Sequence, residues 1–309
     1  MKSRNHKRSS TAKIEPRIDH TKLFSDSSRA VLGFITKLSA GSKPHFPTIF
    51  GTGFFVNSTG LAATNRHVIN IFAQLPPHPK TGESSVAAVL FFPGDDGLSW
   101  QMLVVDPIRW AALAEFTSSD KWYGESIPDI GFVQMAVREV PFLRLATEKY
   151  YLKIGTEVAT IGYPMGTLPL TALGKLNQAS PFLRHGIVSS LFPFPNPFPH
   201  GFTMDIMQQG GSSGSPVLRA ADGIVVGMMS SGVVETNTAQ SQTAALMYTV
   251  NTNISIAEPA HIIQKALEEF GLSHSEDVSC LPTLAELRAR HPKPTAPEEL
   301  TWESWMSKK

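Results

Sequence analysis

The chain has 309 residues, and its 27 Lys and Arg residues against 26 Asp and Glu residues give a formal net charge of +1. This balance argues against a general nucleic-acid binder, which needs a basic surface. With 42% hydrophobic residues the chain can build a sizeable core. Its length allows two domains, or one large β domain with tails.

Cys280 is the only cysteine, so no disulfide can form within the chain. Folding without disulfides suits a reducing compartment. The basic N-terminus is not followed by the apolar run of roughly 7–15 residues that a signal peptide needs. No stretch approaches the roughly 18 apolar residues of a membrane span. We therefore expect a cytoplasmic protein that does not cross a membrane.

The N-terminal segment is strongly basic. Residues 1–22 hold seven Lys and Arg residues, at positions 2, 4, 7, 8, 13, 17 and 22, against acids at 15 and 19. Charged termini of this kind are usually solvated, so we expect a disordered arm over 1–27. Contact of this arm with an acidic partner or a nucleic acid is the open alternative.

From about residue 28 to 258 the sequence consists of short apolar runs separated by Gly, Pro, Asn and Ser turns. The hairpin 53–64 is the clearest pair of strands. Many short strands without alternating long helices favour β-barrels or a sandwich over a doubly wound sheet. The other predicted strands are 85–92, 102–105, 130–137, 157–161, 186–191, 224–230 and 244–250.

Two segments near the C-terminal half are not strands. The tract 192–199 alternates Phe and Pro, and proline lacks the amide hydrogen that a sheet needs, so we expect a stiff loop that is either a lid for a partner or a spacer. Helical spacing of apolar residues predicts a helix over 259–270, opened by Pro259 and closed by Gly271. The tail 272–309 has room for a short helix over 283–290.

Three motifs in the order His, Asp, Ser indicate nucleophilic catalysis by His67, Asp129 and Ser213. A serine hydroxyl near neutral pH needs an imidazole to accept its proton and a carboxylate to fix the imidazole tautomer. The Gly-rich turn 210–214 allows a tight backbone path, so that successive amide groups can converge on an oxyanion.

Other assignments for these motifs fit less well. Asp106 precedes a proline and Asp120 lies among Ser and Lys, whereas Asp129 alone begins an apolar strand. The turn 210–214 also matches the G-x-S-x-G elbow of α/β-hydrolases, but Pro216 and a following strand contradict the helix that this elbow requires. We expect no metal and no organic cofactor, because no His, Asp or Glu pair stands at metal-ligand spacing beside the cysteine.

Six segments, in this order, resemble those of the chymotrypsin-like (trypsin-fold) serine peptidases, and in particular their HtrA/Deg-type, disulfide-free bacterial branch. They are 51–68 with His67, 129–131, 152–166, 186–190, the turn at Ser213, and 254–259. The resemblance implies an all-β fold of two six-stranded antiparallel barrels with a C-terminal helix and the site in the cleft between them. The expected boundaries are 28–147 for barrel 1, 150–258 for barrel 2 and 259–271 for the helix.

The resemblance also implies roles for single residues. Ser213 would be the nucleophile, His67 the general base and then acid, and Asp129 the orienting carboxylate. The amides of Gly211 and Ser213 would form the oxyanion hole. The implied activity is a serine endopeptidase that forms an acyl-enzyme on a protein or peptide substrate.

The chain departs from the family pattern in three places. Ser212 stands where zymogen-activated members carry an aspartate that receives a newly cleaved N-terminal amine, so we do not expect activation by N-terminal trimming. Ser215 replaces the usual second glycine after the nucleophile, a small change. No PDZ-sized segment follows residue 271, so the caged oligomers of many HtrA proteins are not expected.

The substrate-binding residues follow from the same resemblance. Met207 lies six residues before Ser213, where the family places the base of the primary pocket, although a core methionine is the alternative. Without an acid at that base, we expect an apolar side chain before the cleaved bond. The strand that pairs with the substrate backbone would consist of Ser230, Ser231 and Gly232. Either 246–248 or 254–256 would supply the last pocket wall.

Two questions stay open at this level. His185 precedes a predicted strand and belongs either to the surface or to the cleft. The chain could also be a protease-fold binding module whose activity is latent until a regulatory partner binds, through the 192–199 loop or the tails. An intact Ser, His and Asp set speaks against a dead enzyme, because a scaffold has no chemical need for all three.

Overall fold

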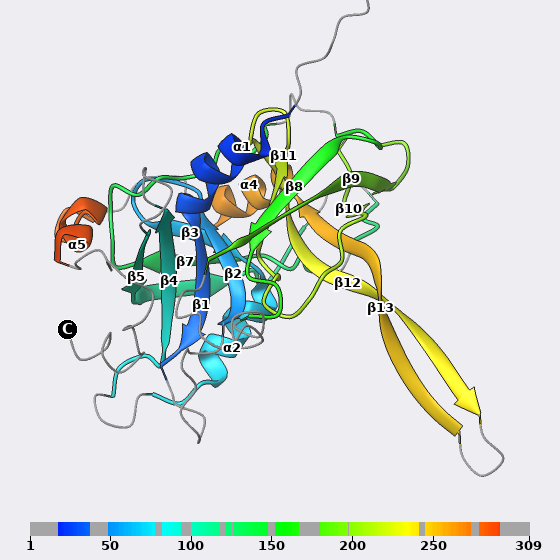
Figure 1. Ribbon diagram of the computed structural model, residues 1–309, viewed down its shortest axis with the longest axis horizontal. Coiled ribbons are helices and arrows are strands. Elements are labelled where there is room, and N and C mark those ends of the chain that lie inside the picture. The colour runs from blue at the N-terminus through cyan, green and yellow to red at the C-terminus, as the bar shows by residue number, and fades with distance from the viewer. Residues whose placement is uncertain are drawn as a thin grey trace, which may run out of the picture.

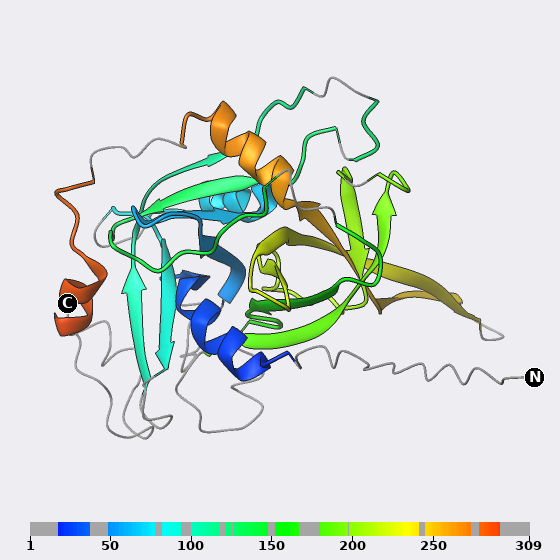
Figure 2. The ribbon, with the colours of Figure 1, turned by 90° about the horizontal axis from the view of Figure 1, so that it is seen from above.

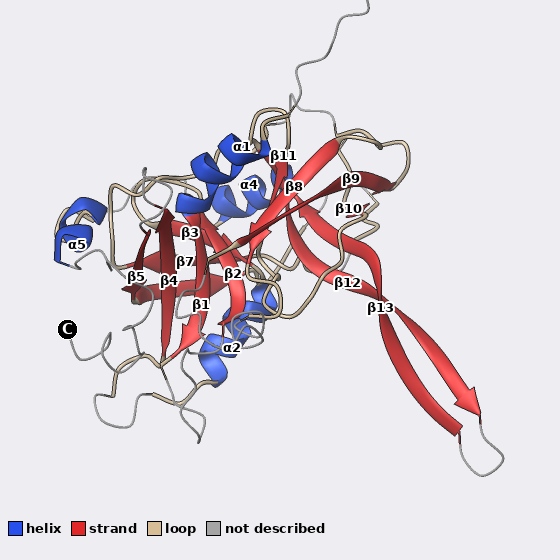
Figure 3. Cartoon of the chain, in the orientation of Figure 1, coloured by secondary structure: helices blue, strands red, loops and turns tan. Residues whose placement is uncertain are grey.

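A seven-stranded sheet and a closed six-stranded barrel lie side by side in the computed structural model (Figure 1). Strands dominate the fold, and the helices lie around them (Figure 3). The structure describes residues 18–37, 49–77, 82–93, 100–117, 121–124, 126–147, 152–166, 180–196, 198–240, 245–272 and 278–290.

The seven-stranded sheet is antiparallel and comes from the N-terminal half, with the strand order β5-β4-β1-β2-β3-β7-β6. Its expected hairpin is confirmed, since Phe54 pairs with Ala63 and Oδ1 of Asn57 accepts hydrogen bonds from the amides of Thr59 and Leu61 in the turn. The strands are β1 Val31–Thr36, β2 Ile49–Phe55, β3 Leu61–Thr64, β4 Val86–Pro93, β5 Trp100–Val105, β6 Pro107–Ala112 and β7 Gly131–Met135.

The expected closure of this sheet into a six-stranded barrel is not seen. It has seven strands, and no described pairing joins its two edges, β5 and β6. These strands are consecutive in the chain and only Asp106 separates them. Pro107 has no amide hydrogen to donate, and the ladder changes there, since β5 pairs with β4 before it and β6 pairs with β7 after it. The expectation of two closed six-stranded barrels is therefore confirmed for the second barrel and not for the first.

The closed barrel has the order β10-β13-β12-β11-β8-β9. Its strands are β8 Glu157–Gly162, β9 Phe182–Phe192, β10 Gly201–Met204, β11 Pro216–Arg219, β12 Val225–Gln240 and β13 Ala245–Pro259. The last two far exceed the predicted 224–230 and 244–250, and they leave the barrel as a long two-stranded projection (Figure 1). The sequence did not predict this length, because the added positions include several Thr and Asn residues instead of a continuous apolar run.

Three clusters of buried apolar side chains hold the fold together. One lies within the seven-stranded sheet, around Leu32, and one within the barrel, around Phe202. The largest joins the two and contains Phe54 and Tyr163 as well as residues of two helices, α1 His20–Ser27 and α4 Ala260–Glu269. Figure 2 shows these helices on opposite sides of the junction between sheet and barrel.

The predicted C-terminal helices are confirmed. Helix α4 begins after Pro259, whose extended backbone precedes the first turn, and it buries Ile262, Ile263 and Ala266. Helix α5, Leu284–Arg290, packs Leu284 against the sheet cluster. One further helix, α2 Arg66–Gln74, carries His67 and was not predicted.

The expected disordered arm over 1–27 needs a correction at its end. Residues 20–27 form α1, with Asp19 as N-cap and Leu23 buried against the junction cluster, and a short 3₁₀ turn, Ser28–Ala30, leads into β1. Residues 1–17 lie outside the described part. Among the described residues, no helix has the length and apolar character to cross a membrane.

Candidate active site

His67 and Asp129 are held together at the start of α2. Nδ1 of His67 lies 2.6 Å from Oδ2 of Asp129, and the amide of His67 donates to Oδ1 of the same carboxylate over 3.0 Å. The side chain of Asn65, the N-cap residue of α2, donates to the carbonyl oxygen of Asp129 (2.9 Å). Asp129 is 9% exposed, whereas the His67 side chain is about half exposed. The carboxylate thus fixes both the position and the tautomer of an accessible imidazole.

Ser213 lies in a glycine turn between β10 and β11. Gly211 (φ +89°) and Gly214 (φ +85°) have left-handed backbones that favour glycine. A Cβ on Gly214 would collide with the carbonyl oxygen of Thr52, and one on Gly211 with the carbonyl oxygen of Tyr163. This turn can therefore form only because glycine occupies both positions.

Thr52 in β2 anchors the turn to the seven-stranded sheet. Its hydroxyl donates to the carbonyl oxygen of Gly211 (2.6 Å), its amide donates to that of Ser213 (2.8 Å), and its hydroxyl accepts from the amide of Tyr163 (3.2 Å). Its own carbonyl oxygen accepts from the hydroxyl of Thr64 (2.7 Å), three residues before His67. These bonds bring the Ser213 turn against the end of β3, next to the helix that carries the imidazole.

The turn leaves two amides available. The amides of Ser212, Gly214 and Ser215 donate to carbonyl oxygens, whereas within the described residues those of Gly211 and Ser213 donate no hydrogen bond. These are the two amides that the resemblance implied for the oxyanion hole. A pair of free N–H groups one residue apart is suited to bind a developing negative charge on a carbonyl oxygen.

Gln208 contacts Ser213, and no motif or spacing in the sequence predicted this contact. Its side-chain Nε2 donates to Oγ of Ser213 (3.1 Å) and to the carbonyl oxygen of Ser230 (3.0 Å). Its Oε1 is buried and has no partner in the described part of the chain. No hydrogen bond joins Ser213 to His67 among the described contacts. The nucleophile candidate thus bonds to Gln208 in this structure.

The proposed substrate strand lies at the start of the long part of β12. Ser230 is buried and its hydroxyl donates to the carbonyl oxygen of Ile256 (3.3 Å), whereas Ser231 and Gly232 are exposed. A Cβ on Gly232 would lie 3.1 Å from Cβ of Gln208. Of the two segments expected as the last pocket wall, 254–256 lies beside this strand, because Ser231 pairs with Ile256, whereas 246–248 pair farther out, on 237–239.

Met207 is half-buried and its carbonyl oxygen accepts a hydrogen bond from the Arg184 guanidinium. Burial lowers the pKa of Arg184 from its ordinary value. No described carboxylate forms an ion pair with this guanidinium. A positive charge, not a negative one, therefore lies beside the expected base of the primary pocket.

Glu258 of β13 supports Asp129 from the side of the barrel. This residue is 8% exposed, and its Oε1 accepts a hydrogen bond from the amide of Asp129 (3.1 Å). Its neighbour Pro259 marks the helix start in the sequence, but nothing in the sequence pattern connects Glu258 with a segment 129 positions away.

The remaining candidates lie elsewhere. Asp106 forms an ion pair with Lys37 (2.8 Å), and Asp120 lies outside the described residues. His185 is placed on the surface of β9, where its ring packs edge-on against that of His20 (4.7 Å between centroids) and its Nε2 lies 3.8 Å from Glu157.

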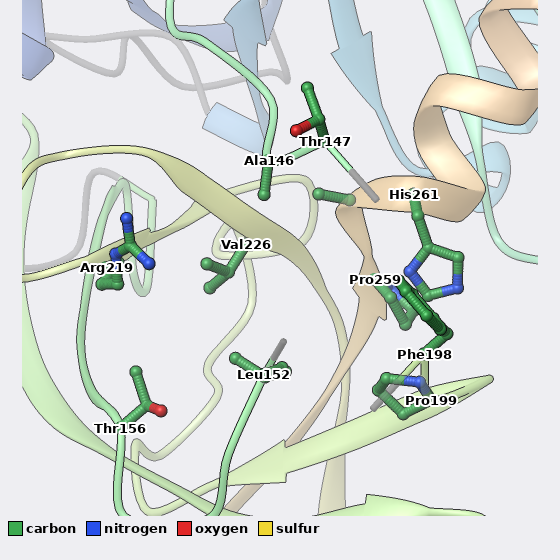
Figure 4. A pocket seen from close by; sticks show the side chains of 11 residues that line it. Ala146, Thr147, Leu152, Thr156, Phe198, Pro199, Arg219, Val226, Pro259 and His261 are labelled. Carbon is green, nitrogen blue, oxygen red and sulfur yellow. The ribbon is translucent and has the colours of Figure 1, made fainter. Parts of the chain in front are cut away.

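A small cavity of about 60 Å³ lies at the start of α4 (Figure 4), and neither His67 nor Ser213 lines it. His261 and Phe198 line it, and burial, assisted by the neighbouring His200, lowers the pKa of His261 to about 4. In the described ranges, no group of three His, Cys, Asp or Glu side chains is placed to hold a metal ion.

The Phe/Pro tract forms the connection between β9 and β10, as expected. Phe192 and Phe194 are exposed, and Phe198 packs edge-on against His261 (5.9 Å). His200, directly after the tract, stacks on Trp122 (4.3 Å).

Comparison with known proteins adds to this geometry. A family model described as a trypsin-like peptidase domain matches residues 51–228. The solved structure of the HtrA-type protease AlgW with decapeptide is similar at 15% identity and a TM-score of 0.51, covering 83% of this chain and 68% of that one. The serine endoprotease from Yersinia pestis is similar at 16% identity and a TM-score of 0.48, covering 82% and 67%. No curated protein matches the sequence.

At these identities the solved structures speak for the fold alone, and the AlgW match agrees with the closed barrel and sheet described above. The family model shows more than the fold. It matches more than half of the chain, and the matched residues include His67, Asp129 and Ser213. The chain belongs to the trypsin-like peptidase family.

Proposed function

We propose that this protein is a serine endopeptidase that cleaves polypeptides through Ser213, His67 and Asp129. The observation that carries the proposal is the double hydrogen bond of the Asp129 carboxylate to the backbone and ring of His67, beside the Ser213 turn anchored by Thr52. A structural role needs no imidazole that is both fixed and accessible, whereas general base catalysis does.

The reaction follows from these positions. Oγ of Ser213 attacks the carbonyl carbon of the scissile bond while Nε2 of His67 takes the hydroxyl proton, and Asp129 stabilises the imidazolium. The amides of Gly211 and Ser213 bind the oxyanion of the tetrahedral intermediate. The imidazolium then protonates the leaving amine, the C–N bond breaks, and an acyl-enzyme remains. Water, deprotonated by His67, hydrolyses the ester and restores the serine.

The proposed specificity is for an apolar residue before the cleaved bond. Met207 brings no acid to the base of the pocket, and the Arg184 guanidinium on its carbonyl oxygen further disfavours a Lys or Arg side chain there. The exposed backbone of Ser231 and Gly232 is suited to pair with the residues that precede the bond.

The test is a comparison of the natural protein with Ser213→Ala. Cleavage of an unstructured protein should fall by at least about a thousandfold while the far-UV spectrum and unfolding midpoint stay unchanged. Ser212→Ala, one position away, is the control and should keep most activity. Undiminished cleavage by Ser213→Ala would refute the assignment.

Labelling by a fluorophosphonate probe separates a constitutive enzyme from a module that is latent until a partner binds. Labelling of Ser213 in the isolated protein means an assembled site. The extent of the peptidase unit, proposed as 28–271, a regulatory partner at 192–199 or the tails, and a cytoplasmic location all stay predictions.

A further inference from the structure

The long ends of β12 and β13 form an arm, defined here as residues 234–240 and 245–251, that projects from the barrel (Figure 1). Val234 pairs with Asn251 at its base, and pairing continues to Gln240 and Ala245. An isolated two-stranded ribbon is only marginally stable in water, so a protein keeps one of this length when something packs on it.

The arm is continuous with the proposed substrate strand. The pairing of β12 with β11 ends at Met228, and beyond that point β12 pairs only with β13. Its outer edge, from Ser231 to Ala239, has no backbone partner among the described residues. An edge without a backbone partner therefore runs from beside Ser213 along the arm, although the carbonyl oxygen of Val233 accepts a hydrogen bond from the hydroxyl of Thr252 (2.7 Å).

This edge carries few of the charges and prolines that normally prevent strand addition. Glu235 is the only charged residue between 233 and 254, and no proline occurs there. The register with β13 shifts between Gly232 and Val234, where three residues of β13, 252–254, lie opposite Val233, and pairing continues beyond this irregularity.

One face of the arm carries apolar side chains on β13. Directly paired residues share a face, so Leu246, Tyr248 and Val250 lie on one side and Met247 and Thr249 on the other. The first three are 65%, 47% and 45% exposed. An extended chain added to the edge of β12 would place every second side chain on this side, next to their β12 partners Ala239, Asn237 and Glu235 and one strand away from the apolar side chains.

We propose that the arm is an extended substrate-binding surface, on which the segment of the polypeptide that precedes the cleaved bond adds as a β-strand to the outer edge of β12. This rests on the proposed function. Because the residues before the bond lie at Ser230 and earlier ones farther out, the substrate runs antiparallel to β12. About ten further residues, some 33 Å of extended chain, fit along the edge. The occupant is therefore an unfolded or extended polypeptide, not a folded protein.

The experiment measures binding of fluorescent peptides to the Ser213→Ala protein, so that it does not depend on catalysis. The peptides share one apolar, uncharged sequence and extend by about four, eight and twelve residues on the N-terminal side of the scissile bond. Affinity should rise at least about tenfold from the shortest to the longest. In a variant whose residues 235–250 are replaced by an Asn-Gly turn, which suits a two-residue hairpin, affinity should stay flat with length.

Two neighbouring residues give a matched control. Tyr248→Ser, on the apolar face, should weaken the longest peptide severalfold and leave the shortest unchanged, whereas Met247→Ser, on the opposite face, should leave both unchanged. Equal effects of the two substitutions would contradict the proposed face.

Three outcomes overturn the proposal. Affinity that does not depend on peptide length in the Ser213→Ala protein is the first, and equal weakening of short and long peptides on arm removal is the second. The third combines two results: removal of the arm changes the molar mass measured by light scattering, and the affinity still depends on peptide length as before. That outcome would assign the arm to contact with a second copy of the chain. Cleavage by the natural protein is measured separately. If affinity depends on peptide length but no peptide is cleaved, the proposed peptide binding by the arm stands and the proposed peptidase activity is rejected.

Discussion

The side chain of Gln208 donates a hydrogen bond to Oγ of Ser213 over 3.1 Å. The same nitrogen donates to the carbonyl oxygen of Ser230 over 3.0 Å, at the start of the proposed substrate strand. The side-chain amide of Gln208 thus bonds both to the hydroxyl oxygen of the candidate nucleophile Ser213 and to the carbonyl oxygen of Ser230, with which a substrate backbone would pair. Gln208 also approaches Gly232, so it lies between the three elements of the expected pocket.

Gln208→Ala should therefore label faster with a fluorophosphonate probe than the natural protein does. Loss of the amide releases Ser213 and Ser230 at once, and we expect a severalfold rise in the second-order rate, since each bond contributes about 1 kcal/mol. Gln209→Ala is the control, because only its backbone carbonyl oxygen bonds within the turn. Slower labelling of Gln208→Ala would instead assign Gln208 to positioning the serine.

Thr52→Val should lower both stability and turnover. The substitution keeps the shape but removes the hydroxyl that bonds to Gly211 and Tyr163, leaving buried groups unpaired at a cost of about 1–3 kcal/mol. Urea unfolding measures the stability, and kcat reports the displaced oxyanion amides. Thr52→Ser keeps the hydroxyl and should behave like the natural protein; if it loses as much turnover as Thr52→Val, the hydroxyl is not what matters.

Glu258→Ala should lower kcat with little change in KM, because Glu258 acts through the amide of Asp129 and not on the substrate. We expect kcat to fall about tenfold, because the carboxylate of Asp129 would shift relative to His67. Glu258→Gln retains an oxygen that can accept the same bond and should recover most of the rate. A rise in KM as large as the fall in kcat would count against this positioning role.

Stability should fall between pH 6.5 and 4 because of His261. The pKa of its folded form, about 4, lies below the ordinary value of 6.5, so the unfolded chain binds a proton that the folded chain excludes. The contribution is present above pH 6.5 and decreases as the pH drops toward 4, by about 3 kcal/mol in total. Urea unfolding at several pH values measures it.

His261→Asn should show a shallower loss of stability over this pH range than the natural protein. His185→Asn removes a histidine from the exposed surface of β9 and serves as the control. If both variants follow the natural pH profile, the buried imidazole does not account for the acid sensitivity.

Local information was enough for much of the fold and for the candidate triad. Two apolar runs on either side of the turn 57–60 marked the hairpin 53–64, helical spacing marked α4, and the start of a strand distinguished Asp129 from Asp106. The order of the His, Asp and Ser motifs along the chain predicted that His67 and Ser213 belong to one catalytic set. Each of these signals lies within a few neighbouring residues, where period and turn chemistry act.

The tertiary structure alone decided the groups that hold the site in place. Thr52 bonds to Gly211 across 159 positions, and Glu258 to Asp129 across 129. The strand order of the first sheet and the length of the arm depend likewise on which strands pair with each other. Sequence by itself determined which chemistry the chain carries, whereas long-range hydrogen bonds and strand pairing, invisible in local periodicity, decided how that chemistry is positioned.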